Sequence, residues 1–206
     1  SSFQSYIRNQ ENIIFPIVAQ PFTEIKYMMG DKKEQHLEVL FSREFLPNFF
    51  ITLNYDIDFS PGVYKRSKMQ NSFFNGNLRY NTKNGRYGIS GYYYNNKIDI
   101  QESGGIKYDS VFINNIETDK SIIDVNLTGA TNLIKVSGFA VDQYFNISGN
   151  KSDGKNDSIS SRRFGIGRIN HHFAYQRNRY IYEDTNPLSY FYQSFDHVID
   201  STKTSD

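Results

Sequence analysis

The chain has 206 residues, and its 23 basic side chains nearly cancel its 22 acidic ones. Such a balance gives no overall field to attract nucleic acid, so no nucleic-acid partner is predicted. The absence of cysteine excludes disulfides, thiol nucleophiles and thiolate metal sites. A mean hydropathy of -0.60, with no apolar run of about 18 residues, excludes a membrane-spanning helix but not a transmembrane β-strand, which is only half apolar.

The two ends of the sequence suggest part of a longer chain. Ser1 and Ser2 open a segment without the positive start and apolar core of a signal peptide. The last residues, 200–206, are polar and resemble the middle of a loop. We expect one β-barrel segment over 1–206, with an entry segment at 1–20, about eight or nine strands in 21–183, and a loop or the start of the next strand in 184–206.

Short segments of alternating apolar and polar residues predict β-strands and no amphipathic helix. The predicted strands are Phe22 to Met29, Leu37 to Phe45, Phe49 to Phe59, Phe73 to Thr82, Arg86 to Asn96, Ile122 to Gly129, Leu133 to Ile147, Phe164 to Arg177 and Arg179 to Glu183.

The segment from Phe49 to Phe59 is the most informative of these. Only Phe50 breaks its alternation, which gives a strand with one apolar and one polar face. Soluble strands usually have about 5 or 6 residues, whereas a tilted transmembrane strand needs roughly 9 to 11. The segment therefore favours a transmembrane β-barrel, in which lipid contacts one face and the lumen the other.

Two neighbouring strands show the same alternation less regularly, and together the three strands define two predicted faces. The predicted lipid-facing residues are Leu37, Val39, Phe41, Phe49, Ile51, Leu53, Tyr55, Ile57 and Phe59. The predicted pore-lining residues are Glu38, Ser42, Glu44, Thr52, Asn54, Asp56, Asp58, Asn75, Asn77 and Arg79. Charges of both signs on the second face are typical of a lumen that selects its solutes.

The connections between predicted strands alternate in kind. The tight ones are Gly30 to Lys33, Leu46 to Asn48 and Lys83 to Gly85, and Asn84-Gly85 predicts a type I′ hairpin turn. The long polar ones are Ser60 to Ser72, Gln101 to Ser121 and Ser148 to Arg162. Tight turns at one rim and long loops at the other are the pattern of an up-and-down barrel, although a β-sandwich with a few long loops gives a similar sequence.

No constellation of residues predicts catalysis, and we expect no enzyme, no metal site and no cofactor. Asp56 and Asp58 lie two apart on a strand, about 7 Å along the backbone, and the sequence gives them no third ligand. His171 and His172 are adjacent on a strand, so their side chains point to opposite faces and cannot chelate one ion together.

Five segments carry a recognisable succession of strand and turn patterns: Pro21 to Tyr27, Ser60 to Tyr64, Ile98 to Ile106, Val125 to Ala130 and Ile169 to Tyr175. In this order they resemble one family, the putative porins of Bacteroidota outer membranes. The resemblance implies an all-β, antiparallel up-and-down transmembrane β-barrel in the bacterial outer membrane, of which this chain is a segment. It also implies outer-membrane lipid as a partner, with envelope or secretion-complex proteins as further partners.

The resemblance implies one kind of modification and two functions. In a Bacteroidota host, Ser110, Ser158 and Ser201 lie in Asp-Ser patterns used for O-glycosylation. The barrel either allows passive solute permeation or serves as a component of an envelope complex. The alternative from the sequence alone is a secreted soluble β-sandwich that binds carbohydrate, because the aromatic fraction of 16% includes many tyrosines that could stack on sugars.

Overall fold

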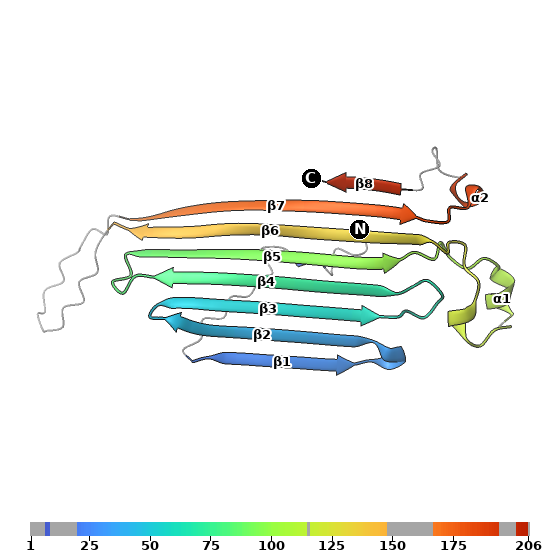
Figure 1. The fold of residues 1–206 in the computed structure, drawn as a ribbon, viewed down its shortest axis with the longest axis horizontal. Helices are drawn as coiled ribbons and strands as arrows, with labels where there is room; N and C mark the ends of the chain where they lie inside the picture. The colour runs from blue at the N-terminus through green and yellow to red at the C-terminus, as the bar shows by residue number, and fades with distance from the viewer. Residues whose placement is uncertain (1–6, 9–19, 115, 148–166, 194–200, 206) are drawn as a thin grey trace, which may run out of the picture.

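The computed structural model describes residues 7–8, 20–114, 116–147, 167–193 and 201–205. Within them, eight antiparallel strands form one sheet, and each strand pairs with the next in sequence (Figure 1). The strands are β1 Phe22–Met29, β2 Gln35–Leu46, β3 Phe49–Ser60, β4 Met69–Asn81, β5 Tyr87–Gln101, β6 Ala130–Asn146, β7 Arg168–Asp184 and β8 Ser201–Ser205. This order confirms the all-β, antiparallel up-and-down architecture. The sheet is open, with β1 and β8 at the two ends of its strand order.

Most predicted strands form, and several extend further than predicted. β1 has the predicted bounds, while β4 begins at Met69 and β5 continues to Gln101. The two segments predicted on either side of Asn178 are a single strand of 17 residues, β7, whose partner β6 is equally long. The sequence allowed for the start of a strand after residue 184, and β8 pairs with β7 there.

The predicted strand from Ile122 to Gly129 is wrong. This segment begins at the end of a short 3-10 helix, η4 (Lys120–Ile122), and its β-pairing is limited to one isolated bridge between Val125 and Ile106. Backbone hydrogen bonds from 124–127 to 103–107 hold it as a loop. Ile123, Val125 and Leu127 are nevertheless buried. An extended loop that packs on one side produces the same alternation as a strand, so the period of two did not distinguish them.

The hairpin at Asn84-Gly85 forms, but not with the predicted type I′ turn. Gly85 has a φ of 64°, whereas Asn84 has no positive φ, and type I′ requires positive φ at both positions. The Gly85 amide donates to the Thr82 carbonyl at 2.9 Å. The turn is thus closed one residue earlier, with the glycine following it in the left-handed conformation.

The two rims do not separate short from long connections as cleanly as predicted. One rim carries the tight β2–β3 and β4–β5 turns, and β6 ends and β7 begins there; the predicted long loop from Ser148 to Arg162 lies outside the described residues. The other carries the β1–β2 connection with η3 (Asp31–Lys33), the β3–β4 loop, the loop 102–129 between β5 and β6, and the segment between β7 and β8. We call the second rim the loop rim.

Short helices occur at the loop rim, where the sequence predicted none: α1 (Asp109–Ile113) and α2 (Ser189–Tyr192) (Figure 1). In the described parts of the chain, no helix has the length and apolar character needed to cross a membrane.

Candidate channel wall and rim pocket

Residues directly opposite one another in antiparallel strands share a face of the sheet, so the register assigns every side chain to one of two faces. Asp56 lies opposite Glu38 on β2 and Phe73 on β4, and all ten predicted pore-lining residues lie on this face, which we call the inner face. All nine predicted lipid-facing residues lie on the other, the outer face. The strand pairing thus brings together each set that the alternation had grouped.

The outer face presents large apolar side chains without a cover from the described residues. Leu53 and Tyr55 are 42% and 41% exposed, and Ile25 on β1 reaches 68%. The sequence had not assigned the outer side chains of β5 to β7, where the aromatic surface continues. The exposed members there include Tyr93, Phe139, Phe145, Phe173 and Tyr175.

This apolar band crosses the sheet at an angle to the hydrogen-bonded rows. The row through Tyr55 is apolar on β1 to β4, with Ile25, Val39, Tyr55 and Phe74, but polar on β5 to β7, with Asn95, Ser137 and Arg177. Strands of a barrel tilt by about 35–45° from its axis, so a band parallel to a membrane must shift along successive strands. The shift is therefore what tilted strands in a bilayer require.

A network of polar contacts covers the inner face of β2 to β4. His36 Nδ1 lies 2.5 Å from Asp58 Oδ1, and Asn71 Nδ2 donates to Asp58 Oδ2 at 3.0 Å. The Ser42 and Thr52 hydroxyls are 2.9 Å apart, and both side chains are buried. Predicted pore-lining residues thus take part in a hydrogen-bonded surface.

Two residues near the start of the chain lie on the inner face. The Arg8 guanidinium forms an ion pair with Asp56, which is 1% exposed, and lies 4.9 Å from the centre of the Phe73 ring. The Arg8 amide donates to Asn96 Oδ1 at 3.2 Å, and Asn96 Nδ2 donates to the Arg8 carbonyl at 2.9 Å. Arg8 therefore supplies the charge that the buried Asp56 carboxylate needs.

The inner face is not polar throughout. Toward the loop rim, β5 and β6 turn apolar side chains inward and charged ones outward: Ile98, Ile100, Ile134 and Val136 are buried in a cluster with Phe73 and Tyr94, while Lys97 and Lys135 face outward. β5 has 15 residues, more than the roughly 9 to 11 that cross a bilayer. The reversal marks where the strand leaves the apolar band.

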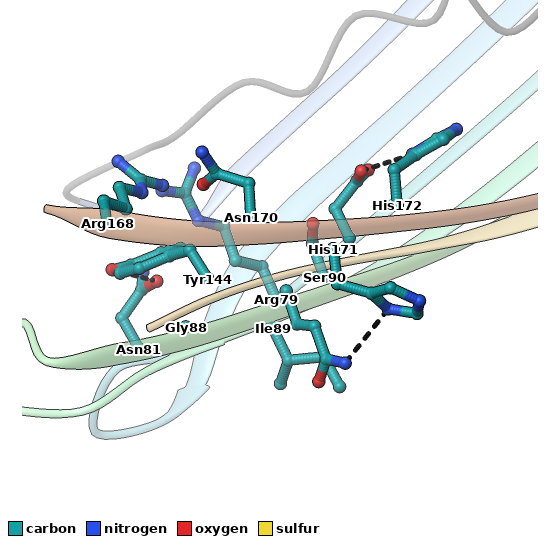
Figure 2. Close-up of a pocket in the computed structure, with 12 residues that line it drawn as sticks. Arg79, Asn81, Gly88, Ile89, Ser90, Tyr144, Arg168, Asn170, His171 and His172 are labelled. Atoms are coloured by element: carbon teal, nitrogen blue, oxygen red, sulfur yellow. Dashed lines mark hydrogen bonds and ion pairs between the residues drawn. The ribbon is translucent and has the colours of Figure 1, made fainter. Parts of the chain in front are cut away.

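A pocket of about 410 Å³ opens at the rim opposite the loop rim, between the ends of β4 to β7 (Figure 2). Arg79, predicted to line the pore, contributes to it together with Arg168 from the start of β7. The Arg168 guanidinium lies 3.9 Å from the centre of the Tyr144 ring. Ser90, Asn170 and the Asp142 carboxylate also line the pocket, so it combines two guanidinium groups with one carboxylate and neutral polar groups.

Gly88 shapes this pocket. A Cβ atom at Gly88 would lie 2.2 Å from Tyr144 Cε1, so only glycine leaves room for the tyrosine ring against β5. The ring in turn supports Arg168 by a cation–π contact.

The two adjacent histidines lie on opposite faces, as their strand position predicted. His171 contacts Gln143 at 3.1 Å on the outer face, and His172 Nδ1 lies 2.5 Å from Asp142 Oδ1 on the inner face (Figure 2). Across the described residues, no three His, Cys, Asp or Glu side chains come close enough to hold a metal ion.

A second buried cluster joins the loop rim to β7. The Tyr192 hydroxyl from α2 donates to Asp184 Oδ2 at 2.7 Å, and it lies 2.6 Å from the Tyr182 hydroxyl. Leu127 and Ala130 pack beside it. Burial, reinforced by the hydrogen bond to Asp184, raises the pKa of Tyr192 above its ordinary value.

The structure describes two of the three predicted glycosylation positions. Ser110 is exposed at the loop rim in α1, which leaves it accessible. Ser201 begins β8, and Ser158 lies outside the described residues. The modification itself stays a prediction.

The sequence interpretation missed Arg8, Arg168 and Asp142. Asp142 and Tyr144 alternate with Gln143 and Phe145 in a predicted strand. The side chains on each face of β6 could therefore have been assigned from this alternation, as they were for β3. Arg8 stands in a segment without periodicity, and only the structure places it beside Asp56.

Comparison with known proteins assigns the family. A family model described as putative porin matches residues 1–206. Searches of curated proteins and of solved structures found no match. An up-and-down antiparallel sheet with an exposed apolar band agrees with the architecture that a porin requires. The chain is a member of the putative porin family.

Proposed function

We propose that this chain forms part of the wall of an outer-membrane channel through which small solutes pass without chemical change. The observation that carries the proposal is the register, which divides the strands into an apolar outer face and a mainly polar inner face. Family membership supports a channel of porin type in the outer membrane. Outer-membrane lipid is then the partner of the outer face, and no enzymatic step is involved.

The inner face has the polar character of a hydrated wall. Asn54, Asn71 and Asn75 each have a buried amide oxygen without a hydrogen-bond partner among the described residues. A buried oxygen without a partner costs about 1–3 kcal/mol. These oxygens are covered in the structure, so the hydrated surface that we propose is made by the half-exposed inward side chains, among them Glu38, Asp58 and Arg79.

The charges on this wall suggest how it discriminates between solutes. Acidic groups dominate on β2 and β3, where Glu38, Glu44 and Asp58 face inward, while Arg79 and Arg168 meet at the rim pocket. A ring of one charge favours entry of the opposite charge. We propose that the acidic part of the wall favours cationic groups and that the rim pocket favours anionic ones.

The orientation follows from the connections and the band. Outer-membrane barrels have short periplasmic turns and longer extracellular loops. The loop rim has the longer described connections and both α-helices, and β5 to β7 continue beyond the apolar band on that side. We therefore place the loop rim outside the cell and the rim pocket at the periplasmic end.

Conductance tests the proposal. The full protein, reconstituted in a planar bilayer, should give steps of ionic current, and Arg79→Glu should shift the permeability ratio toward cations. Leu78→Ile, on the neighbouring outward position, is the control and should leave the ratio unchanged. Bilayers that conduct no more with the protein than without it would contradict the channel function.

A second candidate is the role of barrel component in an envelope complex, favoured by exposed apolar residues in the loop between β5 and β6. Ile113 and Ile116 are 75% and 67% exposed, and Tyr108 and Ile122 are also exposed. Extraction in mild detergent should then give a particle larger than the porin alone. Ile113→Ser with Ile116→Ser should reduce that particle to the porin's own size, and an unchanged size would argue against this role.

A further inference from the structure

The outer face of β5 to β7 carries a group of cations at the edge of the apolar band. Lys97 lies directly opposite Lys135, and Lys135 lies directly opposite Arg179. Arg177 is two residues along β7 from Arg179 and faces the same way. We call these four residues the basic patch. It lies on the far side of the channel wall from the rim pocket and plays no part in the proposed permeation.

Their mutual position is costly unless an anion joins them. Side chains directly opposite on neighbouring strands have Cβ atoms about 4.5–5.5 Å apart, and like charges at that separation are destabilising. Among the described residues, no carboxylate forms an ion pair with any member of the patch. Asp99 and Glu183 face outward farther toward the loop rim and are the nearest carboxylates along these strands.

The patch also has the form of a binding site. A hollow of about 170 Å³ is lined by Lys135, Arg177 and Arg179 together with the polar side chains of Asn95 and Ser137. Lys97 is exposed beside it, and Lys135 is half-buried. Amide and hydroxyl groups among cations are the usual donors to a phosphate, and arginine matches its oxygens with two parallel hydrogen bonds.

Three successive rows give the order of the groups that a lipid would meet. Tyr93, Phe139 and Tyr175 form the last aromatic row of the band, and the Phe139 and Tyr175 rings are 5.8 Å apart. Asn95, Ser137 and Arg177 follow, and then Lys97, Lys135 and Arg179. Each row is about 7 Å farther along the strands. In a phosphorylated glycolipid, the acyl chains, the sugar that carries them and the phosphates on that sugar follow in the same order.

We infer that the basic patch binds the phosphate groups of a phosphorylated glycolipid of the outer leaflet, with the acyl chains on the aromatic row. The inference rests on the proposed outer-membrane location and on the loop rim facing outward. It identifies a specific lipid contact, whereas the apolar band alone would accept any acyl chain.

The test uses the full protein in lipid nanodiscs and measures its affinity for bisphosphorylated lipid A, for the same lipid A after removal of its phosphates, and for phosphatidylglycerol. The variant combines Lys97→Gln, Lys135→Gln and Arg179→Gln. The control combines Lys65→Gln, Lys68→Gln and Lys107→Gln, which removes the same charge from the loop rim outside the patch. Single-channel conductance is recorded for each protein.

We expect the patch variant to lose at least tenfold in affinity for bisphosphorylated lipid A, the control to keep it, and the wild type to bind the dephosphorylated lipid as weakly as the variant does. Equal losses in both variants, or equal binding of the dephosphorylated lipid, would overturn the inference. Equal affinity for phosphatidylglycerol would also overturn it, because the site would then not select a glycolipid.

Lys135→Arg should keep binding, which guards against a folding defect in the triple variant. Normal conductance with lost lipid binding separates this site from the channel, whereas failure of the channel proposal appears as a wild type that does not conduct.

Discussion

At the scale of single residues, Leu53 and Asn54 give the sharpest contrast on β3. They are adjacent, and the structure places them on opposite faces. An arginine at a lipid-facing position near mid-membrane costs roughly 2–4 kcal/mol. Leu53→Arg should therefore lower the free energy of unfolding by that amount in a vesicle-folding titration, while Asn54→Arg should change it little. Equal losses at both positions would contradict the assigned faces.

The contact between Arg8 and Asp56 makes a second prediction at this scale. Asp56 is 1% exposed, so Arg8→Gln should leave a buried carboxylate without its counter-charge and destabilise the protein by about 3–5 kcal/mol. Adding Asp56→Asn to that variant should recover much of the loss, because the buried charge is removed with its partner. A double variant as unstable as the sum of the single ones would show that the pair is not coupled.

At the scale of an element, two glycines on neighbouring strands form a matched pair. A Cβ at Gly138 on β6 would lie 2.7 Å from the Tyr175 carbonyl oxygen and 2.6 Å from the Tyr94 hydroxyl, whereas at Gly91 on β5 the nearest atom is 3.9 Å away. Gly138→Ala should cost about 1–3 kcal/mol, the usual penalty for overpacking. Gly91→Ala should be neutral or slightly stabilising, because alanine restricts the unfolded chain. Urea unfolding in vesicles measures both, and a loss at Gly91 matching that at Gly138 would count against this packing.

The attachment of α2 to the end of β7 predicts a pH dependence. Burial and the hydrogen bond to Asp184 raise the pKa of Tyr192, so the folded state keeps the proton more tightly than the unfolded state, where tyrosine titrates near pH 10. The stabilisation is complete below about pH 10 and decreases above it. The stability advantage of the wild type over Tyr192→Phe should therefore narrow as the pH rises past 10. A difference between the wild type and Tyr192→Phe that stays constant with pH would contradict the prediction.

How much of each element the sequence could predict depends on what covers its two faces. β3 lies between two neighbouring strands with one apolar face, so its alternation predicted its bounds to within one residue and which of its side chains share a face. Near Lys97, the two faces of β5 exchange character: charged side chains face outward and apolar ones inward. The reason is that this end of the strand lies beyond the apolar band and packs against other apolar side chains on the inner face. The prediction ended at Asn96, where the pattern changes. The segment from Ile122 to Gly129 has strand-like alternation but packs as a loop, which depends on contacts far away in sequence.

The rim pocket could be predicted only in part, for a related reason. The alternation along its own strand predicted that Arg79 lies on the inner face. Arg168 lines the same pocket because β6 pairs with β7. That pairing is set by a connection that carries no tight-turn signal. The position of Arg8 on the inner face could not be predicted at all, because it depends on neither alternation nor turn chemistry.

At the scale of the whole molecule, the open sheet has a requirement of its own. Lipid offers no hydrogen-bond partners to backbone, so a sheet within a bilayer must be closed into a barrel. The sheet described has β1 and β8 at the ends of its order. In a membrane, both strands must therefore pair with further backbone, and amide hydrogens along β1 should exchange slowly in the vesicle-bound protein. Rapid exchange along β1 there would argue against a closed wall.

The most direct test of the account is the environment of alternate side chains on β3. The chain has no cysteine, so single cysteines at positions 51 to 58 can each carry a spin label without background. In lipid vesicles, accessibility to oxygen should be high at 51, 53, 55 and 57 and low at 52, 54, 56 and 58, while a water-soluble nickel complex should show the opposite preference. The same accessibility at all eight positions, or high oxygen accessibility at the even ones, would contradict the conclusion that lipid contacts the outer face.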